Sequence, residues 1–94
     1  MKKYTFEFTA SDYTLVKGVV YVGTAQDIMA CYKSCERAYY NMRSNCGPLY
    51  NMPTLKADSM YGLVFMDHDL TTHFYVENSD TILRGISNGF YIPV

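Results

Sequence analysis

The chain has 94 residues, 49% of them hydrophobic, and a net charge of −1 at neutral pH. This content excludes a disordered tail and predicts one domain over residues 1–94 with its own hydrophobic core. The balanced charge argues against general nucleic-acid binding. No apolar run approaches about 18 residues, so the sequence predicts no membrane-spanning helix.

The start of the chain, MKKYTFEFTASD, has two lysines but lacks the apolar stretch of a secretory signal. The three cysteines, Cys31, Cys35 and Cys46, are an odd number. Without an export signal, this number favours reduced thiols over a disulfide framework. We therefore expect a cytoplasmic protein.

The first 22 residues predict a β-hairpin. Residues 3–9, KYTFEFT, alternate apolar and polar side chains, which is typical of a half-buried strand. Residues 10–12 read as a turn, and residues 13–22, YTLVKGVVYV, as a second strand. The run from Val19 to Val22 is apolar on both faces, which favours a central position. Gly18 indicates a bulge or a close approach of two backbones.

Residues 24–45 predict the one long helix. Thr24 and Asp27 have the spacing of a capping box, and Gly47 with Pro48 ends the segment. Apolar side chains recur every three or four residues, at Ile28, Cys31, Tyr32, Cys35, Ala38, Tyr39 and Met42. They form one stripe of an amphipathic helix, and a lone helix needs a sheet to bury such a stripe.

The remaining segments add two more strands. Residues 46–60 predict a long loop, residues 61–66 and 72–76 two strands, and residues 67–71 their hairpin loop. Ser79 is expected to cap a short helix over residues 80–87, although Gly85 within it lowers the helix propensity. Residues 90–92 are expected to form an edge strand. The order ββαββ predicts an α+β fold. We expect a two-layer sandwich of four to five antiparallel strands on one long helix, with a short C-terminal helix or edge strand.

The cysteines allow three interpretations. Cys31, Cys35 and Cys46 with His68 or His73 include the ligand types of a zinc site. Cys31 and Cys35 fall within the apolar stripe of the helix, however, where a thiol packs as a small hydrophobic group. A Cys35–Cys46 disulfide is the third alternative. We favour packed thiols and expect no metal.

A second cluster, Asp67, His68, Asp69 and His73, could hold a divalent cation or supply a general base. Its spacing matches no motif with a defensible mechanism, and hairpin loops also select Asp for turn hydrogen bonds. The sequence lacks a G-x-S-x-G motif and a glycine-rich phosphate loop. We therefore expect a protein without cofactor or enzymatic activity.

Charge and tyrosine content suggest a binding surface. Residues 57–94 carry one basic and five acidic side chains, and the whole chain has ten tyrosines. The acidic segment could dock a basic partner, or it could be solvated loops. Tyrosine suits binding surfaces and half-buried sheets alike. Because hairpin tips are free to specialise, the candidate partner-binding residues are Asp67, His68, Asp69, Tyr75 and Glu77.

In its length, tyrosine and acid content and lack of catalytic motifs, the whole chain resembles small phage- or mobile-element-encoded inhibitors of bacterial defence, such as anti-CRISPR proteins. The resemblance implies a stoichiometric inhibitor that blocks a functional surface, for example a basic one, of a larger protein or complex. The alternative is an oligomeric small-molecule or nucleotide-binding module with a tyrosine-lined interface, so a homo-oligomer stays open. Direct nucleic-acid binding through Lys33, Arg37 and Arg43 is disfavoured, because spread charges are typical of a solvated helix face.

Overall fold

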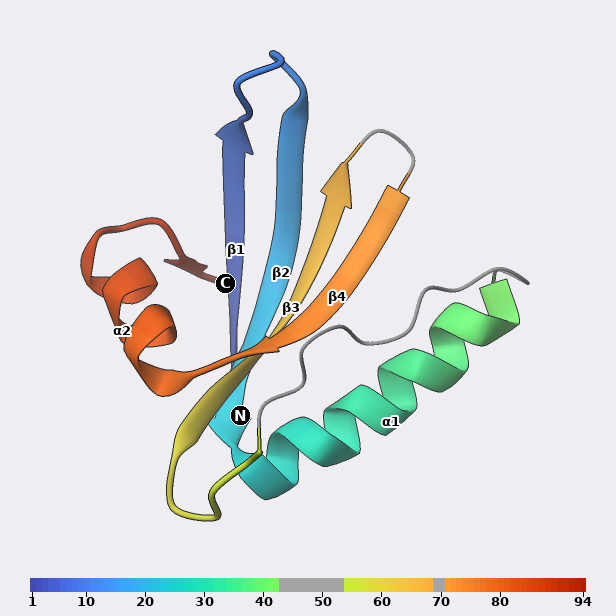
Figure 1. Cartoon of the computed structure of the whole chain (residues 1–94), viewed down its shortest axis with the longest axis vertical. Helices are drawn as coiled ribbons and strands as arrows, with labels where there is room; N and C mark the ends of the chain where they lie inside the picture. The colour runs from blue at the N-terminus through green and yellow to red at the C-terminus, as the bar shows by residue number, and fades with distance from the viewer. Residues whose placement is uncertain (43–53, 69–70) are drawn as a thin grey trace.

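The computed structural model describes residues 1–42, 54–68 and 71–94. A five-stranded antiparallel sheet in the order β4-β3-β2-β1-β5 forms its centre (Figure 1). Its elements are β1 (Lys2–Thr9), β2 (Leu15–Thr24), α1 (Ala25–Met42), β3 (Met60–His68), β4 (Thr71–Glu77), α2 (Ser79–Ser87) and β5 (Ile92–Pro93). The predicted α+β class, the ββαββ order and the packing of the sheet on the long helix are confirmed.

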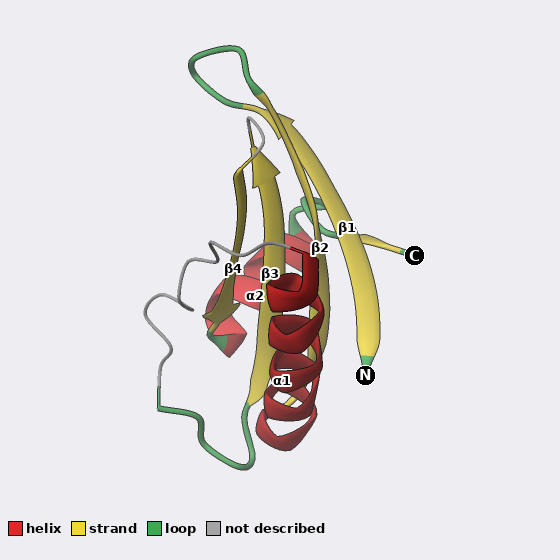
Figure 2. Ribbon diagram, turned by 90° about the vertical axis from the view of Figure 1, so that its right-hand side faces the viewer, coloured by secondary structure: helices red, strands yellow, loops and turns green. Residues whose placement is uncertain are grey.

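The two helices lie against opposite faces of the sheet, α1 in front and α2 behind in Figure 2. Successive side chains of a strand point to opposite faces, so the strand register divides the core in two. The α1 face carries the buried cluster Ala25, Ile28, Tyr61, Leu63, Phe74 and Val76. The α2 face carries the buried cluster Tyr4, Phe6, Val16, Val20, Val22, Val64, Ile82 and Tyr91.

Strand β2 occupies the central position that its two-sided apolar pattern predicted. It pairs with β1 on one side and with β3 on the other. A Cβ at Gly18 would collide with the Phe65 carbonyl oxygen of β3 and with the Phe6 ring, which confirms the close approach. β2 begins at Leu15 rather than at Tyr13. The reason is that Tyr13 has a positive φ of 65° in a turn closed by a 2.8 Å hydrogen bond from Ala10 N–H to the Thr14 carbonyl oxygen.

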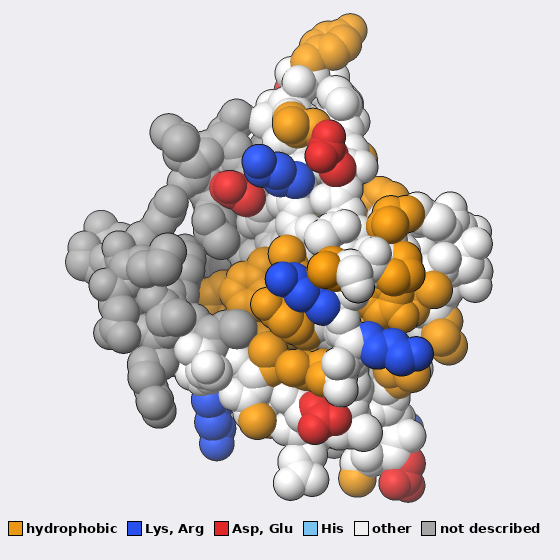
Figure 3. Space-filling model, turned by 180° about the vertical axis from the view of Figure 1, so that it is seen from behind, with side chains coloured by type: hydrophobic (Ala, Val, Ile, Leu, Met, Phe, Trp, Pro, Cys, Tyr) orange, Lys and Arg blue, Asp and Glu red, His pale blue; other side chains and the backbone are white. Residues whose placement is uncertain are grey.

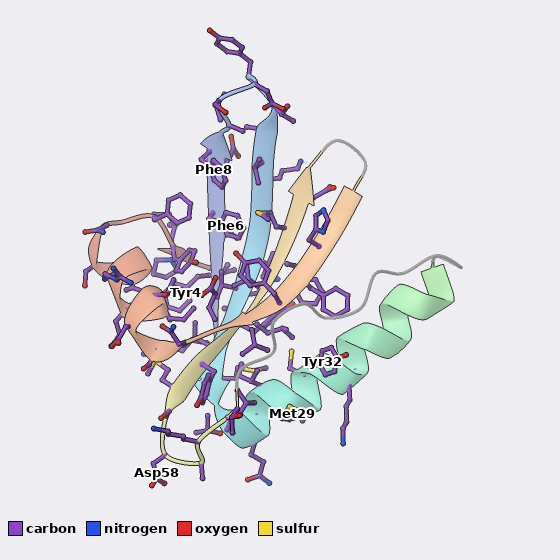
Figure 4. All side chains as sticks on the ribbon, viewed as in Figure 1. Tyr4, Phe6, Phe8, Met29, Tyr32 and Asp58 are labelled. Atoms are coloured by element: carbon purple, nitrogen blue, oxygen red, sulfur yellow. The ribbon has the colours of Figure 1, made fainter. Side chains whose placement is uncertain are left out.

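Helix α1 begins directly where β2 ends. The predicted capping box is present: Thr24 Oγ1 donates to Asp27 Oδ2 at 3.0 Å, and the Asp27 N–H donates to Thr24 Oγ1 at 3.3 Å. Ile28 is fully buried and Cys31 is half-buried against the sheet, as the apolar stripe predicted. Tyr32, labelled in Figure 4, is also half-buried and packs on the same cluster. The predicted helix end at residues 43–48 lies outside the described residues.

The β3–β4 hairpin is longer than predicted. Asp67 and His68 belong to β3, where they pair with Thr72 and Thr71, so that only residues 69–70 connect the strands. Asp67 also lies opposite Lys17 of β2. Because opposite charges on neighbouring strands favour pairing, this register helps to extend the ladder. The predicted hairpin loop at 67–71 is therefore corrected to strand at its first two and last positions.

The described part of the predicted loop at 46–60 is held against the core. The buried Tyr61 hydroxyl accepts a 2.6 Å hydrogen bond from Lys56 N–H and donates one of 3.4 Å to the Thr54 carbonyl oxygen. Leu55 packs on the α1-face cluster. Residues 46–53 of the predicted loop lie outside the described residues.

Helix α2 starts one residue earlier than predicted, and β5 starts two residues later. The N-cap is Asn78 rather than Ser79, since Asn78 Oδ1 accepts the Thr81 N–H at 3.0 Å. At the other end, the N–H groups of Phe90 and Tyr91 donate to the Gly85 carbonyl oxygen at 2.9 and 3.0 Å. These bonds hold the chain at the helix end, so β5 begins only at residue 92. No helix in the described ranges is long and apolar enough to cross a membrane.

Candidate functional site: a hollow on the sheet

The α1 face has an open hollow of about 670 Å³, at the end of the sheet away from the start of α1. Figure 3 shows this side of the molecule, with hydrophobic side chains between groups of charged ones. We call it the sheet hollow. It extends around the outer edge of β1, and its lining residues are Thr5, Phe6, Glu7, Lys17, Gly18, Val19, Phe65, Met66, Asp67, Gly89, Phe90 and Ile92.

A row of alternating charges crosses one end of the sheet hollow. Glu7 of β1 lies opposite Lys17 of β2, which lies opposite Asp67 of β3, and all three side chains are exposed. Opposite charges placed across neighbouring strands contribute roughly 0.2–1 kcal/mol per pair. The row therefore presents an acid, a base and an acid in a fixed order.

Aromatic contacts fix the apolar floor of the sheet hollow. The Phe65 ring meets the Tyr21 ring edge-on at a centroid distance of 6.1 Å and stacks on the Phe74 ring at 5.5 Å. Phe74 in turn lies 5.9 Å from the Tyr32 ring of α1. The Lys3 ammonium lies 5.9 Å from the centre of the Tyr21 ring. Because Phe65 is held on two sides, it offers a rigid apolar surface to a partner.

Tyr75 and Glu77 lie on the α2 face, together with Tyr91. Both are half-buried. The Tyr75 hydroxyl donates a hydrogen bond to the Glu77 carboxylate. Burial, followed by the Glu77 charge, raises the pKa of Tyr75 to about 12. Burial also raises the pKa of Glu77, against the effect of the Tyr75 hydrogen bond, and raises the pKa of Tyr91. These groups are a packed polar cluster beneath α2.

The structure separates the predicted partner-binding residues. Asp67 is on the α1 face, whereas Tyr75 and Glu77 are on the α2 face, so these three side chains do not share a surface. His68 is the last residue of β3. Asp69 lies outside the described residues, and so does the side chain of His68.

The predicted acidic surface is likewise dispersed in the described part of the chain. Asp58, at a loop tip in Figure 4, precedes β3, whereas Asp67 lies near the other end of that strand. Asp80 is in the first turn of α2, against the opposite face of the sheet. Consecutive elements thus carry the carboxylates to different sides.

The described tyrosines do not form an exposed group. Tyr4, Tyr61 and Tyr91 are buried, and Tyr13 is the only tyrosine exposed among the side chains that the structure describes, at 90%. The sheet hollow is lined by phenylalanines instead. Sequence reasoning missed most of this site, although the polar positions Thr5 and Glu7 marked the accessible side of the first strand.

Metal ligands do not gather in the described ranges, where no group of three His, Cys, Asp or Glu side chains is close enough to hold an ion. Cys31 is half-buried and packs against the α1-face cluster, as the interpretation of packed thiols expects. Cys46 and the side chain of Cys35 lie outside the described residues.

Comparison of the chain with protein-family models, with curated proteins and with solved structures finds no match.

Proposed function

We propose that the chain is a small non-enzymatic protein-binding module that acts stoichiometrically through the sheet hollow. The observation that supports it is an apolar floor at Val19 and Phe65 beside the exposed charge row Glu7–Lys17–Asp67. Neither helix covers this part of the sheet. An apolar centre with a polar rim is the usual anatomy of a protein interface. Of the residues predicted from the sequence, Asp67 keeps a place in this surface.

The charge row defines the chemistry of the partner. A complementary surface has basic groups opposite Glu7 and Asp67, an acidic group opposite Lys17, and an apolar side chain that enters the hollow. Such complementarity mainly speeds association and excludes wrong partners. By size and composition the partner class that we favour is a bacterial defence complex, blocked in the cytoplasm by this chain.

The test compares two charge reversals. Glu7→Lys combined with Asp67→Lys changes the row, whereas Asp58→Lys is a matched control at an exposed carboxylate on the far end of β3. Partners are captured from a bacterial lysate on the wild-type chain, and the kinetics of each complex are measured by surface plasmon resonance. We expect an association rate about tenfold lower for the double variant, with a smaller difference at high salt.

The proposal also predicts a cellular effect. In bacteria that carry an active CRISPR system, the wild-type chain should restore plaques of a targeted phage, and the double variant should not. Unchanged association rates for the double variant, or an equal loss with Asp58→Lys, would place the contact surface elsewhere.

A second candidate is binding of a small molecule in the same hollow. Its volume of about 670 Å³ lies within the range of roughly 300–1,000 Å³ that ligand sites occupy. Native mass spectrometry of the purified chain separates the two candidates. An added mass of an organic ligand that Phe65→Ala releases would favour the small molecule, whereas a bare chain favours the protein partner.

A further inference from the structure

Strand β1 is only partly covered on its outer side. In the described ranges, β5 pairs with β1 at Tyr4 and Thr5, and Val94 N–H donates to the Lys3 carbonyl oxygen at 3.2 Å. On this outer side, the other half of β1, Phe6–Thr9, has no described strand next to it, as Figure 1 shows. An open sheet edge is a template for a further strand.

The bond from Val94 to Lys3 fixes which backbone groups face outward. Outward-facing positions alternate along an antiparallel strand, so they are Lys3, Thr5, Glu7 and Thr9. Pro93, which has no N–H, pairs with Tyr4, whose backbone groups face β2 instead. β5 thus occupies the first two outward positions, and Glu7 and Thr9 present the next N–H and C=O groups.

Most of the exposed large apolar side chains in the described ranges lie on the hairpin that contains this edge or at β5 beside it. Of the nine large hydrophobic side chains exposed in the described part of the chain, six lie on the β1–β2 hairpin or in the segment at β5. They are Phe8, Tyr13, Leu15, Phe90, Ile92 and Val94. The rings of Phe8 and Phe90 lie 5.5 Å apart and form one apolar surface on the α2 face of the edge. Only Glu7 brings a charge to Phe6–Thr9, so the edge lacks the usual protection against pairing.

We propose that a second copy of the chain covers this edge, with β1 pairing antiparallel to β1 across a two-fold axis at Phe8. Charge and the exposed Phe8 ring together favour this register. An axis at Glu7 would place two carboxylates opposite each other, which is unfavourable. An axis at Phe8 places the two Phe8 rings opposite each other and pairs Glu7 with Thr9 of the second copy. Every outward N–H and C=O of these residues then has a partner.

The interface is isologous and short. The same patch serves both copies, with the Phe8 and Phe90 rings as its apolar centre. Pairing over so few residues buries little area, so we expect a dissociation constant of about 1–100 μM. The dimer shares Glu7 and Phe90 with the lining of the sheet hollow, but its axis at Phe8 lies outside that lining. The Phe8 variants therefore test the dimer separately from the partner proposed for the hollow.

A charge-swap experiment tests the axis at Phe8. Phe8 is 36% exposed, so a long polar side chain can reach water from this position. Phe8→Lys and Phe8→Glu each set like charges on the axis, and each should raise the dissociation constant about 100-fold. Mixing the two variants should restore a dimer, since Lys then meets Glu. Leu83→Lys, a matched change at a 50% exposed side chain of α2, should leave the dimer intact.

Sedimentation velocity at about 10–500 μM protein gives the oligomeric state, and native mass spectrometry identifies the mixed dimer by its mass. Circular dichroism checks that each variant is folded. If a Phe8 variant is not folded, Thr9→Pro, which removes an outward N–H at the end of β1, should give the same monomer. A monomeric wild type over this range, a failure of the mixture to pair, or dissociation by Leu83→Lys would each overturn the proposal.

Discussion

Tyr75 shows how one covered side chain changes its acid–base behaviour. In the unfolded chain its phenol loses its proton near the ordinary pKa of 10.0, whereas in the folded protein burial and the Glu77 charge keep the proton until about pH 12. Between these values the folded state binds more protons than the unfolded state. The contribution of Tyr75 to the free energy of unfolding is therefore fully present below pH 10 and is lost as the pH rises towards 12.

This difference predicts an alkaline loss of stability. Because Tyr75 is only half-buried, solvent screens part of the effect, and we expect a loss of about 1 kcal/mol. Tyr75→Phe removes the titrating group and should flatten this part of the decline. Urea unfolding at about pH 8 and about pH 11 measures it, with Tyr13→Phe as the control for loss of an exposed hydroxyl. Equal declines for wild type and Tyr75→Phe would contradict the assignment.

At the scale of elements, the junction between α2 and β5 depends on Gly85. A Cβ on Gly85 would lie 2.5 Å from Cε2 and 2.6 Å from Cδ2 of the Tyr91 ring. The missing side chain lets the buried Tyr91 ring rest directly on the helix. The residue that weakened the sequence-based prediction of α2 is thus the one that allows the helix to pack.

Gly85→Ala should therefore destabilise the protein. In an ordinary helix this change stabilises by about 1 kcal/mol, but here overpacking against Tyr91 costs roughly 1–3 kcal/mol. We expect a net loss of about 1 kcal/mol in urea unfolding. The same substitution in a Tyr91→Ala background should instead stabilise, because the clash is gone. Stabilisation in both backgrounds would show that Tyr91 moves aside freely.

At the scale of the whole molecule, two helices on opposite faces share one set of strands. Ile28 of α1 and Ile82 of α2 are both fully buried, each in the cluster of its own face. Both clusters contain side chains of β3 and β4, so loss of the sheet would expose both clusters at once. We expect a single cooperative unfolding transition.

Ile28→Ala and Ile82→Ala should each cost about 2–5 kcal/mol. Because unfolding is cooperative, each change should lower hydrogen-exchange protection equally for the slowest amides of both helices. Hydrogen exchange followed by NMR resolves the two helices. If Ile82→Ala released only α2 and left α1 protected, the two faces would be separate folding units.

The sequence predicted those features that are local. The alternation at Tyr4, Phe6 and Phe8 located β1, and the spacing of Thr24 and Asp27 located the start of α1. The sheet hollow could not be predicted in this way, because it depends on the register between strands. Glu7 meets Lys17 only because of the turn with a positive φ at Tyr13.

The burial of Tyr75 and Glu77 could not be predicted from the sequence for a different reason. In the sequence they alternate with Phe74 and Val76, whose side chains belong to the α1-face cluster. That pattern cannot show that α2 covers the more polar face of β4, because α2 is formed by residues later in the chain.

The alternation of faces also shapes how this chain can diverge. Thr5 and Val19 line the sheet hollow, whereas their neighbours Tyr4 and Val20 are buried beneath α2. Substitutions that retarget the hollow therefore leave most of the α2-face cluster unchanged, and such separate sites contribute to stability nearly independently. Lineages under pressure from a changing partner could vary one side of each strand rapidly while keeping the fold.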